Sequence, residues 1–161
     1  MLDDRKWLTL TDEEVFDIRE AIKEVTKFND KVVLVGTDSQ MFDRKVDFVT
    51  AIVIVTPGKG ARAFYTKEKN QKFNSIREKL VKETWMSVQT ATELEPLLPA
   101  GMDLAVHIDA SSDKRWRSSK HVQELVGMVV GQGFRAVIKH QAFAASHVAE
   151  HIVKGRNIET V

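Results

Sequence analysis

The spacing of hydrophobic residues alternates along the chain between a helical period and the short runs typical of strands. Near the N-terminus, the capping sequence Thr-Asp-Glu-Glu begins at Thr11, and apolar residues follow it at helical spacing. We therefore expect a first helix over about residues 11–28. A second capping sequence, Ser-Ile-Arg-Glu, begins a long helix predicted for 75–94, and two shorter helices are predicted for 120–130 and 142–154.

Five further segments carry the residues that favour strands. The first, 32–35, is apolar on both faces and ends just before Gly-Thr-Asp, and the second, 46–56, is rich in β-branched residues. The others cover 61–66, 104–108 and 134–139. The first three follow one another too closely for crossover helices, which predicts an antiparallel meander. The last two alternate with helices, so the first, fourth and fifth strands are expected to run parallel.

These elements predict an α/β fold with a mixed five-stranded sheet, in which an antiparallel three-strand meander is joined by two parallel strands. Helices flank this sheet, and the helix at 11–28 is an addition to it. The chain of 161 residues has three prolines and no repeats or linker-like tract. We expect a single domain over 1–161 with its core at about 31–154.

The composition excludes several classes of function. The absence of cysteine excludes disulfides, thiolate metal sites and a cysteine nucleophile. A net charge of +1 gives no overall attraction to nucleic acid or membranes, so such binding requires a local patch. The first residues lack the basic and apolar regions of a signal peptide, and no apolar run approaches the roughly 18 residues that a membrane helix needs. We expect a soluble, cytoplasmic protein with no membrane partner.

Two predicted parallel strands lead into an aspartate. Val-Leu-Val-Gly-Thr precedes Asp38, and Ala-Val-His-Ile precedes Asp109. Neighbouring strands lie about 4.8 Å apart, and ligands of open α/β sheets bind beyond the carboxyl ends of the strands. Two carboxylates there repel each other unless a metal or a proton compensates. Aspartates also commonly open turns after strands, but the occurrence of both in this strand order favours a site for Mg²⁺, which prefers oxygen ligands.

Five segments occur along the chain in a recognisable order: VGTDSQ at 35–40, FVTAIVI at 48–54, SIREKLVKET at 75–84, HID at 107–109 and AFAASHVAE at 142–150. Over roughly residues 32–154 the chain thereby resembles the YkuK-like family of predicted RNase H-related nucleases. The resemblance implies an RNase H-like fold whose acidic residues, here Asp38 and Asp109, hold divalent metals, Mg²⁺ or Mn²⁺. It also implies a nuclease.

The resemblance implies a further glutamate from the helix after the meander, which offers Glu78 and Glu83. Glu83 flanks the apolar stripe of this helix, whereas Glu78 points further away from it. Glu78 lies in the first turn, nearer the strand ends, and is also the acid of the capping sequence. We slightly favour Glu78 as the metal ligand, with Glu83 as a close alternative.

At the fourth acidic position, where family members tend to carry an aspartate, this chain has Gln141. A glutamine can ligate a cation but adds no charge, so Glu150 or His147 on the predicted last helix could take its place. The same helix spells H-x-x-E-H up to His151, the motif of some zinc proteases. A zinc site needs a third protein ligand, so a solvated helix face is the favoured interpretation of this motif.

A basic segment directly follows Asp109. Its lysines and arginines are suited to binding phosphates, and its tryptophan is suited to stacking on a base. A polar loop with a serine helix cap is the alternative interpretation. The candidate substrate-binding residues are Lys114, Arg115, Trp116, Arg117 and Lys120.

Two functions are consistent with this sequence. The first is a metal-dependent phosphodiesterase, a nuclease that acts on RNA, DNA or a hybrid through an acidic two-metal site. The second is a non-catalytic nucleic-acid-binding or protein-binding module of RNase H-like fold. The retained acids Asp38 and Asp109 favour the nuclease, whereas Gln141 favours the binding module.

Overall fold

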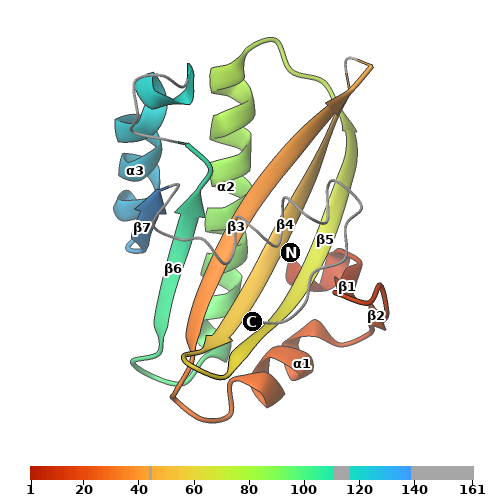
Figure 1. Cartoon of the computed structure of the whole chain (residues 1–161), viewed down its shortest axis with the longest axis vertical. Helices are drawn as coiled ribbons and strands as arrows, with labels where there is room; N and C mark the ends of the chain where they lie inside the picture. Colours follow the sequence, from red (N-terminus) through yellow and green to blue (C-terminus); the bar gives the residue numbers. More distant parts are fainter. Residues whose placement is uncertain (44, 111–116, 139–161) are drawn as a thin grey trace.

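The structure, a computed structural model, describes residues 1–43, 45–110 and 117–138 (Figure 1). Its centre is a seven-stranded sheet with the order β2-β1-β5-β4-β3-β6-β7. The strands are β1 (Trp7–Thr9), β2 (Glu14–Val15), β3 (Val32–Phe42), β4 (Lys45–Thr56), β5 (Gly60–Gln71), β6 (Asp103–Ile108) and β7 (Arg135–Ile138). The helices are α1 (Ile18–Val25), α2 (Ile76–Leu94) and α3 (Val122–Gly131), with short 3-10 turns η1 (Leu2–Asp4), η2 (Glu95–Leu97) and η3 (Arg117–His121).

The mixed topology that the sequence predicts is confirmed, but the number of strands is not. β3, β4 and β5 form the antiparallel meander, while β6 pairs parallel to β3 and β7 pairs parallel to β6. The sheet has seven strands rather than five, because β1 and β2 extend it beyond β5. The predicted helix at 142–154 lies outside the described residues.

The first predicted helix is wrong at its N-terminal end. Asp12 has a positive φ of 64°, and its N–H donates to the carbonyl of Thr9, while the N–H of Thr9 donates to the carbonyl of Glu13. These bonds make residues 9–13 the turn between β1 and β2. The helix α1 instead begins at Ile18, after Asp17, whose side chain caps it. Threonine and aspartate stabilise tight turns and helix starts by the same local hydrogen bonds.

The strand β3 is also longer than predicted, because it does not end before Asp38. β4 pairs with it along its whole length, and Asp38 lies opposite Val49. The pairing of β3 with β6 ends earlier, at Gly36 and His107. Asp38 therefore lies within β3, just beyond the last paired residues of the parallel neighbour.

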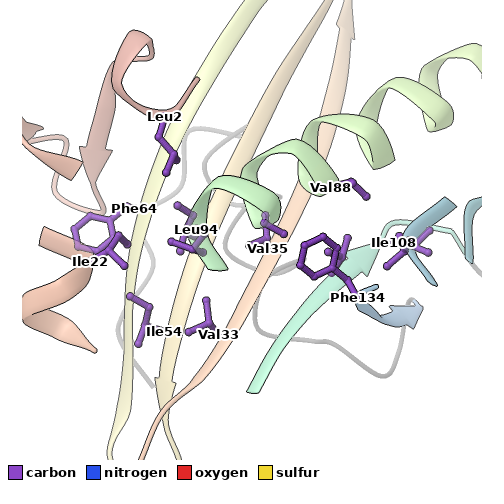
Figure 2. Packing of buried hydrophobic residues seen from close by; sticks show 14 of the residues in the cluster. Leu2, Ile22, Val33, Val35, Ile54, Phe64, Val88, Leu94, Ile108 and Phe134 are labelled. Carbon is purple, nitrogen blue, oxygen red and sulfur yellow. The ribbon is translucent and has the colours of Figure 1, made fainter. Parts of the chain in front are cut away.

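The helix α2 covers one face of the sheet and begins where predicted (Figure 1). Ser75 caps it by accepting a hydrogen bond from the N–H of Glu78 at 3.1 Å. Strand residues that alternate with one another face this helix, so Val33 and Val35 pack with Val88 and Leu94 (Figure 2). Leu34, which lies between Val33 and Val35, faces the opposite side of the sheet. It belongs to a second buried cluster there, made of Leu34, Val49, Ala51, Val53, Ala63, Tyr65, Ala105 and Val137.

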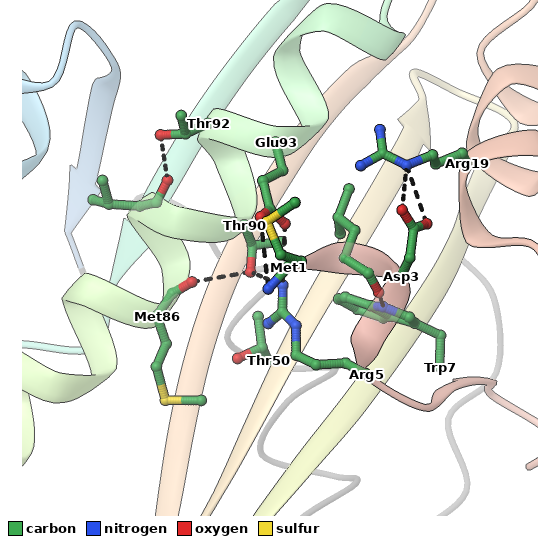
Figure 3. A network of polar contacts seen from close by, with 12 residues as sticks. Met1, Asp3, Arg5, Trp7, Arg19, Thr50, Met86, Thr90, Thr92 and Glu93 are labelled. Carbon is green, nitrogen blue, oxygen red and sulfur yellow. Dashed lines mark hydrogen bonds and ion pairs between the residues drawn. The ribbon is translucent and has the colours of Figure 1, made fainter.

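Polar contacts hold the N-terminal segment against the C-terminal half of α2 (Figure 3). The guanidinium of Arg5 donates to Thr90 Oγ1 at 3.0 Å, lies 4.0 Å from a carboxylate oxygen of Glu93 and stacks 5.0 Å above the ring of Trp7. The indole N–H of Trp7 donates to the carbonyl of Leu2 at 2.9 Å. These contacts place the hairpin of β1 and β2 at the edge of β5. No helix among the described residues is long and apolar enough to cross a membrane.

Candidate functional site

The site is built on the parallel pair β3 and β6. Gly36 pairs with His107, and two residues further along each strand direction lie Asp38 and Asp109. Because the two strands run in the same direction, these aspartates share a register position and lie on the same face of the sheet. Their side chains form a hydrogen bond with each other. The structure therefore brings together the two carboxylates that the sequence places after the predicted strands.

The proximity of these carboxylates changes their protonation. Burial, the hydrogen bond with Asp109 and the charges of Asp109 and Glu83 together raise the pKa of Asp38 to about 8, against one backbone N–H from Ser39 that lowers it. That N–H donates to Asp38 Oδ1 at 2.8 Å. Two carboxylates in contact cannot both carry a charge at low cost. The Asp38–Asp109 pair therefore retains a proton at neutral pH when no cation is bound.

Glu83 on α2 is the third carboxylate of this region. It is only 3% exposed, accepts a hydrogen bond from the hydroxyl of Ser39 and lies 3.7 Å from the ammonium of Lys79, one turn earlier on the helix. The pKa of Glu83 is raised to about 8, mainly by burial and also by the charge of Asp109, while Lys79 and Ser39 act to lower it. Electrostatic coupling thus links Glu83 to both aspartates.

Buried hydroxyl groups fix α2 against β3 beneath this region. The hydroxyl of Thr37 contacts that of Ser87 at 2.7 Å and that of Thr50 at 3.0 Å. Thr37 precedes Asp38 on the strand, and Ser87 lies one helical turn after Glu83. These contacts contribute to the packing of α2 on β3, and so to which of its carboxylates faces the strand ends.

The two candidate glutamates have different surroundings. Glu78 is exposed, and its carboxylate accepts a hydrogen bond at 3.1 Å from the N–H of Asn74, the residue before the N-cap Ser75, so it serves to close the N-terminus of α2. Glu83, by contrast, interacts electrostatically with Asp38. The structure therefore brings Glu83, rather than Glu78, to the aspartates.

The donor atoms of this region suit a hard divalent cation. Among the residues that the structure describes, no group of three histidine, cysteine, aspartate or glutamate side chains is placed to hold a metal ion. The carboxylate of Glu83 is engaged with Ser39 and Lys79 instead. The carboxylates of Asp38, Asp109 and Glu83 nevertheless offer oxygens, the ligands that Mg²⁺ and Mn²⁺ prefer. On the same face, the side-chain oxygen of Gln40 is buried and accepts no hydrogen bond within residues 1–43, 45–110 and 117–138. A cation would take the place of the proton that the aspartates share and would offer this oxygen a partner.

Several candidates from the sequence cannot be placed. Lys114, Arg115 and Trp116 lie outside the described residues, as do Gln141, His147 and Glu150. Arg117 and Lys120 belong to η3, and Lys120 is exposed.

The sheet register adds a basic residue to the same face. Asp38 pairs with Val49, and Val49 pairs with Lys67 on the next strand. Lys67 is exposed and its ammonium lies 5.9 Å from the centre of the Tyr65 ring. Two strand spacings separate its backbone from that of Asp38, a distance of about 10 Å. No local sequence pattern indicates Lys67, because its alignment with Asp38 depends on pairing between three strands.

Comparison with known proteins agrees with this geometry. The chain matches the model of the ribonuclease H-like family over residues 14–154, and it therefore belongs to that family. It is 27% identical over 158 residues to the uncharacterized protein YkuK of Bacillus subtilis (strain 168), with 90% of this chain and 92% of that protein covered. No solved structure matches significantly. The YkuK-like, RNase H-like resemblance is confirmed, and family membership points to a nuclease or another nucleic-acid-related function.

Proposed function

We propose that this protein is a metal-dependent nuclease in which Asp38, Asp109 and Glu83 hold divalent cations. The contact between Asp38 and Asp109 carries the proposal, because two adjoining carboxylates that must share a proton form a site that a cation neutralises better. The cations would be Mg²⁺ or Mn²⁺, which fit an all-oxygen donor set.

The residues of the chain have separate tasks in this proposal. Asp38 and Asp109 are held in fixed positions by paired strands, so their oxygens bind without a large reorganisation. Ser39 orients the carboxylate of Glu83, and Lys79 partly balances its charge. Bound metal ions supply an activated water and stabilise the leaving oxygen of a phosphodiester.

The substrate in this proposal is a nucleic acid, whether RNA, DNA or a hybrid. Because the net charge is only +1, binding depends on local cations near the acidic site. Lys67 lies on the face of Asp38, and none of the described residues forms an ion pair with it. Lys120 and the basic residues before it, which follow Asp109 in the sequence, are the other candidates.

The test is a cleavage assay on single-stranded RNA, single-stranded DNA and an RNA–DNA hybrid, with Mg²⁺ or Mn²⁺. Asp38→Asn and Asp109→Asn should each reduce cleavage by at least about 100-fold, the scale on which loss of a transition-state electrostatic contact acts. Asp4→Asn changes an exposed aspartate near the N-terminus, remote in sequence from the site residues, and should cleave as the parent does. Cleavage that survives both site substitutions would refute the proposal.

A second function is a nucleic-acid-binding module without catalysis. One observation favours it: no group of three histidine, cysteine, aspartate or glutamate side chains among the described residues is placed to hold a metal ion. The family resemblance adds that Gln141 supplies no charge at a position where it implies an acid. This function predicts binding of an oligonucleotide by the parent without cleavage under any of these metal conditions, and equal binding by Asp38→Asn.

A further inference from the structure

Gln40 has a buried side-chain oxygen that accepts no hydrogen bond from any residue that the structure describes. It follows Asp38 by two positions on β3, so strand alternation places both side chains on the same face of the sheet. Asp47 on β4 lies directly opposite Gln40 in the antiparallel register. Two of the register neighbours of Gln40 on this face, Asp38 and Asp47, are therefore carboxylates, which accept hydrogen bonds when ionised but do not donate them.

An amide oxygen without a donor is uncommon in a protein interior. Its burial removes hydrogen bonds with water without providing a replacement, so buried amide oxygens are normally bonded to a protein donor, an ordered water or an ion. A leucine at this position would fill similar space without that cost. The side chain of Gln40 is thus better suited to a state in which a further group approaches its oxygen.

We propose that Gln40 is a ligand of the divalent cation held by Asp38 and Asp109, binding it directly or through one of its waters. This inference rests on the proposed function, because it concerns the same cation. A cation satisfies the oxygen of Gln40 and at the same time separates the two negative charges. As a neutral donor, the amide adds a ligand without adding repulsion to a region that already holds three carboxylates. The chemistry selects a hard ion such as Mn²⁺ or Mg²⁺.

The test measures the binding of Mn²⁺ alone to the full chain, by the loss of the free-ion electron paramagnetic resonance signal and by calorimetry. Gln40→Leu and the nearly isosteric Gln40→Met should weaken Mn²⁺ binding roughly 10–100-fold, the effect typical of lost supporting contacts at metal sites. Gln40→Glu should bind Mn²⁺ more tightly than either variant. Gln89→Leu, which changes an exposed glutamine on α2, should bind as the parent does.

The melting temperature, measured first without metal and then with Mn²⁺, gives a second test of the role of Gln40. Removing an unsatisfied buried oxygen should raise the melting temperature of the metal-free Gln40→Leu protein by about 2–4 °C, the shift expected for a small stabilisation of a chain of this size. Mn²⁺ should then stabilise this variant much less than it stabilises the parent. A purely structural role for Gln40 would instead lower the metal-free melting temperature.

The outcomes separate this inference from the proposed nuclease function. Equal Mn²⁺ affinity of the parent, Gln40→Leu and Gln40→Met overturns the role of Gln40 and leaves the nuclease proposal intact. Weaker binding by both variants in a protein that cleaves no nucleic acid supports Gln40 and refutes the nuclease. A parent that binds no Mn²⁺ overturns both.

Discussion

Asp38 on β3 and Asp109, which directly follows β6, each lie two residues beyond the last pair of these parallel strands, Gly36 and His107, and their carboxyl groups are hydrogen-bonded to each other. β3 continues past this point in its pairing with β4, whereas β6 ends at Ile108. The pair therefore lies where the parallel part of the sheet ends, with β3 held rigidly by its other neighbour. This is the place in an α/β sheet at which ligands are expected.

The stability of the metal-free protein should fall as the pH rises. Asp38 and Glu83 both have a pKa raised to about 8 in the folded state, above the usual values of 3.8 and 4.5. Between these values the folded state holds more protons than the unfolded state, so the free energy of unfolding decreases with pH, by at most about 1.4 kcal/mol per pH unit for one group. Thermal melts from pH 4.5 to 8.5 in a chelator measure this slope.

Asp38→Asn should flatten this dependence, because its amide carries no proton to lose. Asp4→Asn provides the matched control, since Asp4 is exposed, and it should retain the slope of the parent. Mg²⁺ should restore stability above pH 7, because metal binding requires the deprotonated carboxylates. A parent whose melting temperature stays constant from pH 5 to 8 without metal would contradict the shared proton.

Glu83 and Glu78 should differ sharply in their effect on activity. Glu83→Gln removes a buried charge that interacts with both aspartates, so it should lower cleavage by at least about 100-fold. Glu78→Gln retains a side-chain oxygen that can accept the hydrogen bond from the N–H of Asn74, so activity and stability should stay near those of the parent. Steady-state cleavage rates of the two variants decide between them, and the reverse order would return the metal-ligand role to Glu78.

Loss of the Thr37 hydroxyl should destabilise the contact between β3 and α2. Thr37→Val leaves the buried hydroxyls of Ser87 and Thr50 with one partner fewer, at a cost of about 1–3 kcal/mol. Urea unfolding of Thr37→Val, Ser87→Ala and the double variant measures the coupling between them. The double variant should lose less stability than the sum of the two single losses, and strictly additive losses would show that the two hydroxyls are energetically independent.

Lys67 should contribute to nucleic-acid binding through a phosphate. Its exposed ammonium lies on the face of Asp38, so Lys67→Ala should weaken binding and reduce the slope of log affinity against log salt by about 1. Lys59→Ala, in the turn between β4 and β5 at the opposite end of these strands, should leave that slope unchanged. Fluorescence anisotropy with a labelled oligonucleotide at several salt concentrations measures both, and identical slopes for the two variants would exclude a phosphate contact by Lys67.

The periodicity of the sequence was sufficient for the central elements. The capping sequence at Ser75 and the apolar stripe after it predicted α2, and the close succession of three strands predicted the meander. The local sequence pattern gave a wrong prediction at residues 11–17, because threonine and aspartate form the same local hydrogen bonds at helix starts and in tight turns. Thr11 and Asp12 read as a helix start, but the pairing of Leu8 with Tyr65 draws this segment into the sheet and makes it a turn.

The sequence by itself determined which carboxylates follow the parallel strands, because Asp38 and Asp109 end apolar runs that only a doubly covered sheet explains. Only the tertiary structure decided which residues join them. Glu83 rather than Glu78 interacts electrostatically with the aspartates, in a packing of α2 on β3 to which the contact of Thr37 with Ser87 contributes. Lys67 and Gln40 share the face of Asp38 because of strand register, a relation between segments that no local pattern in the chain contains.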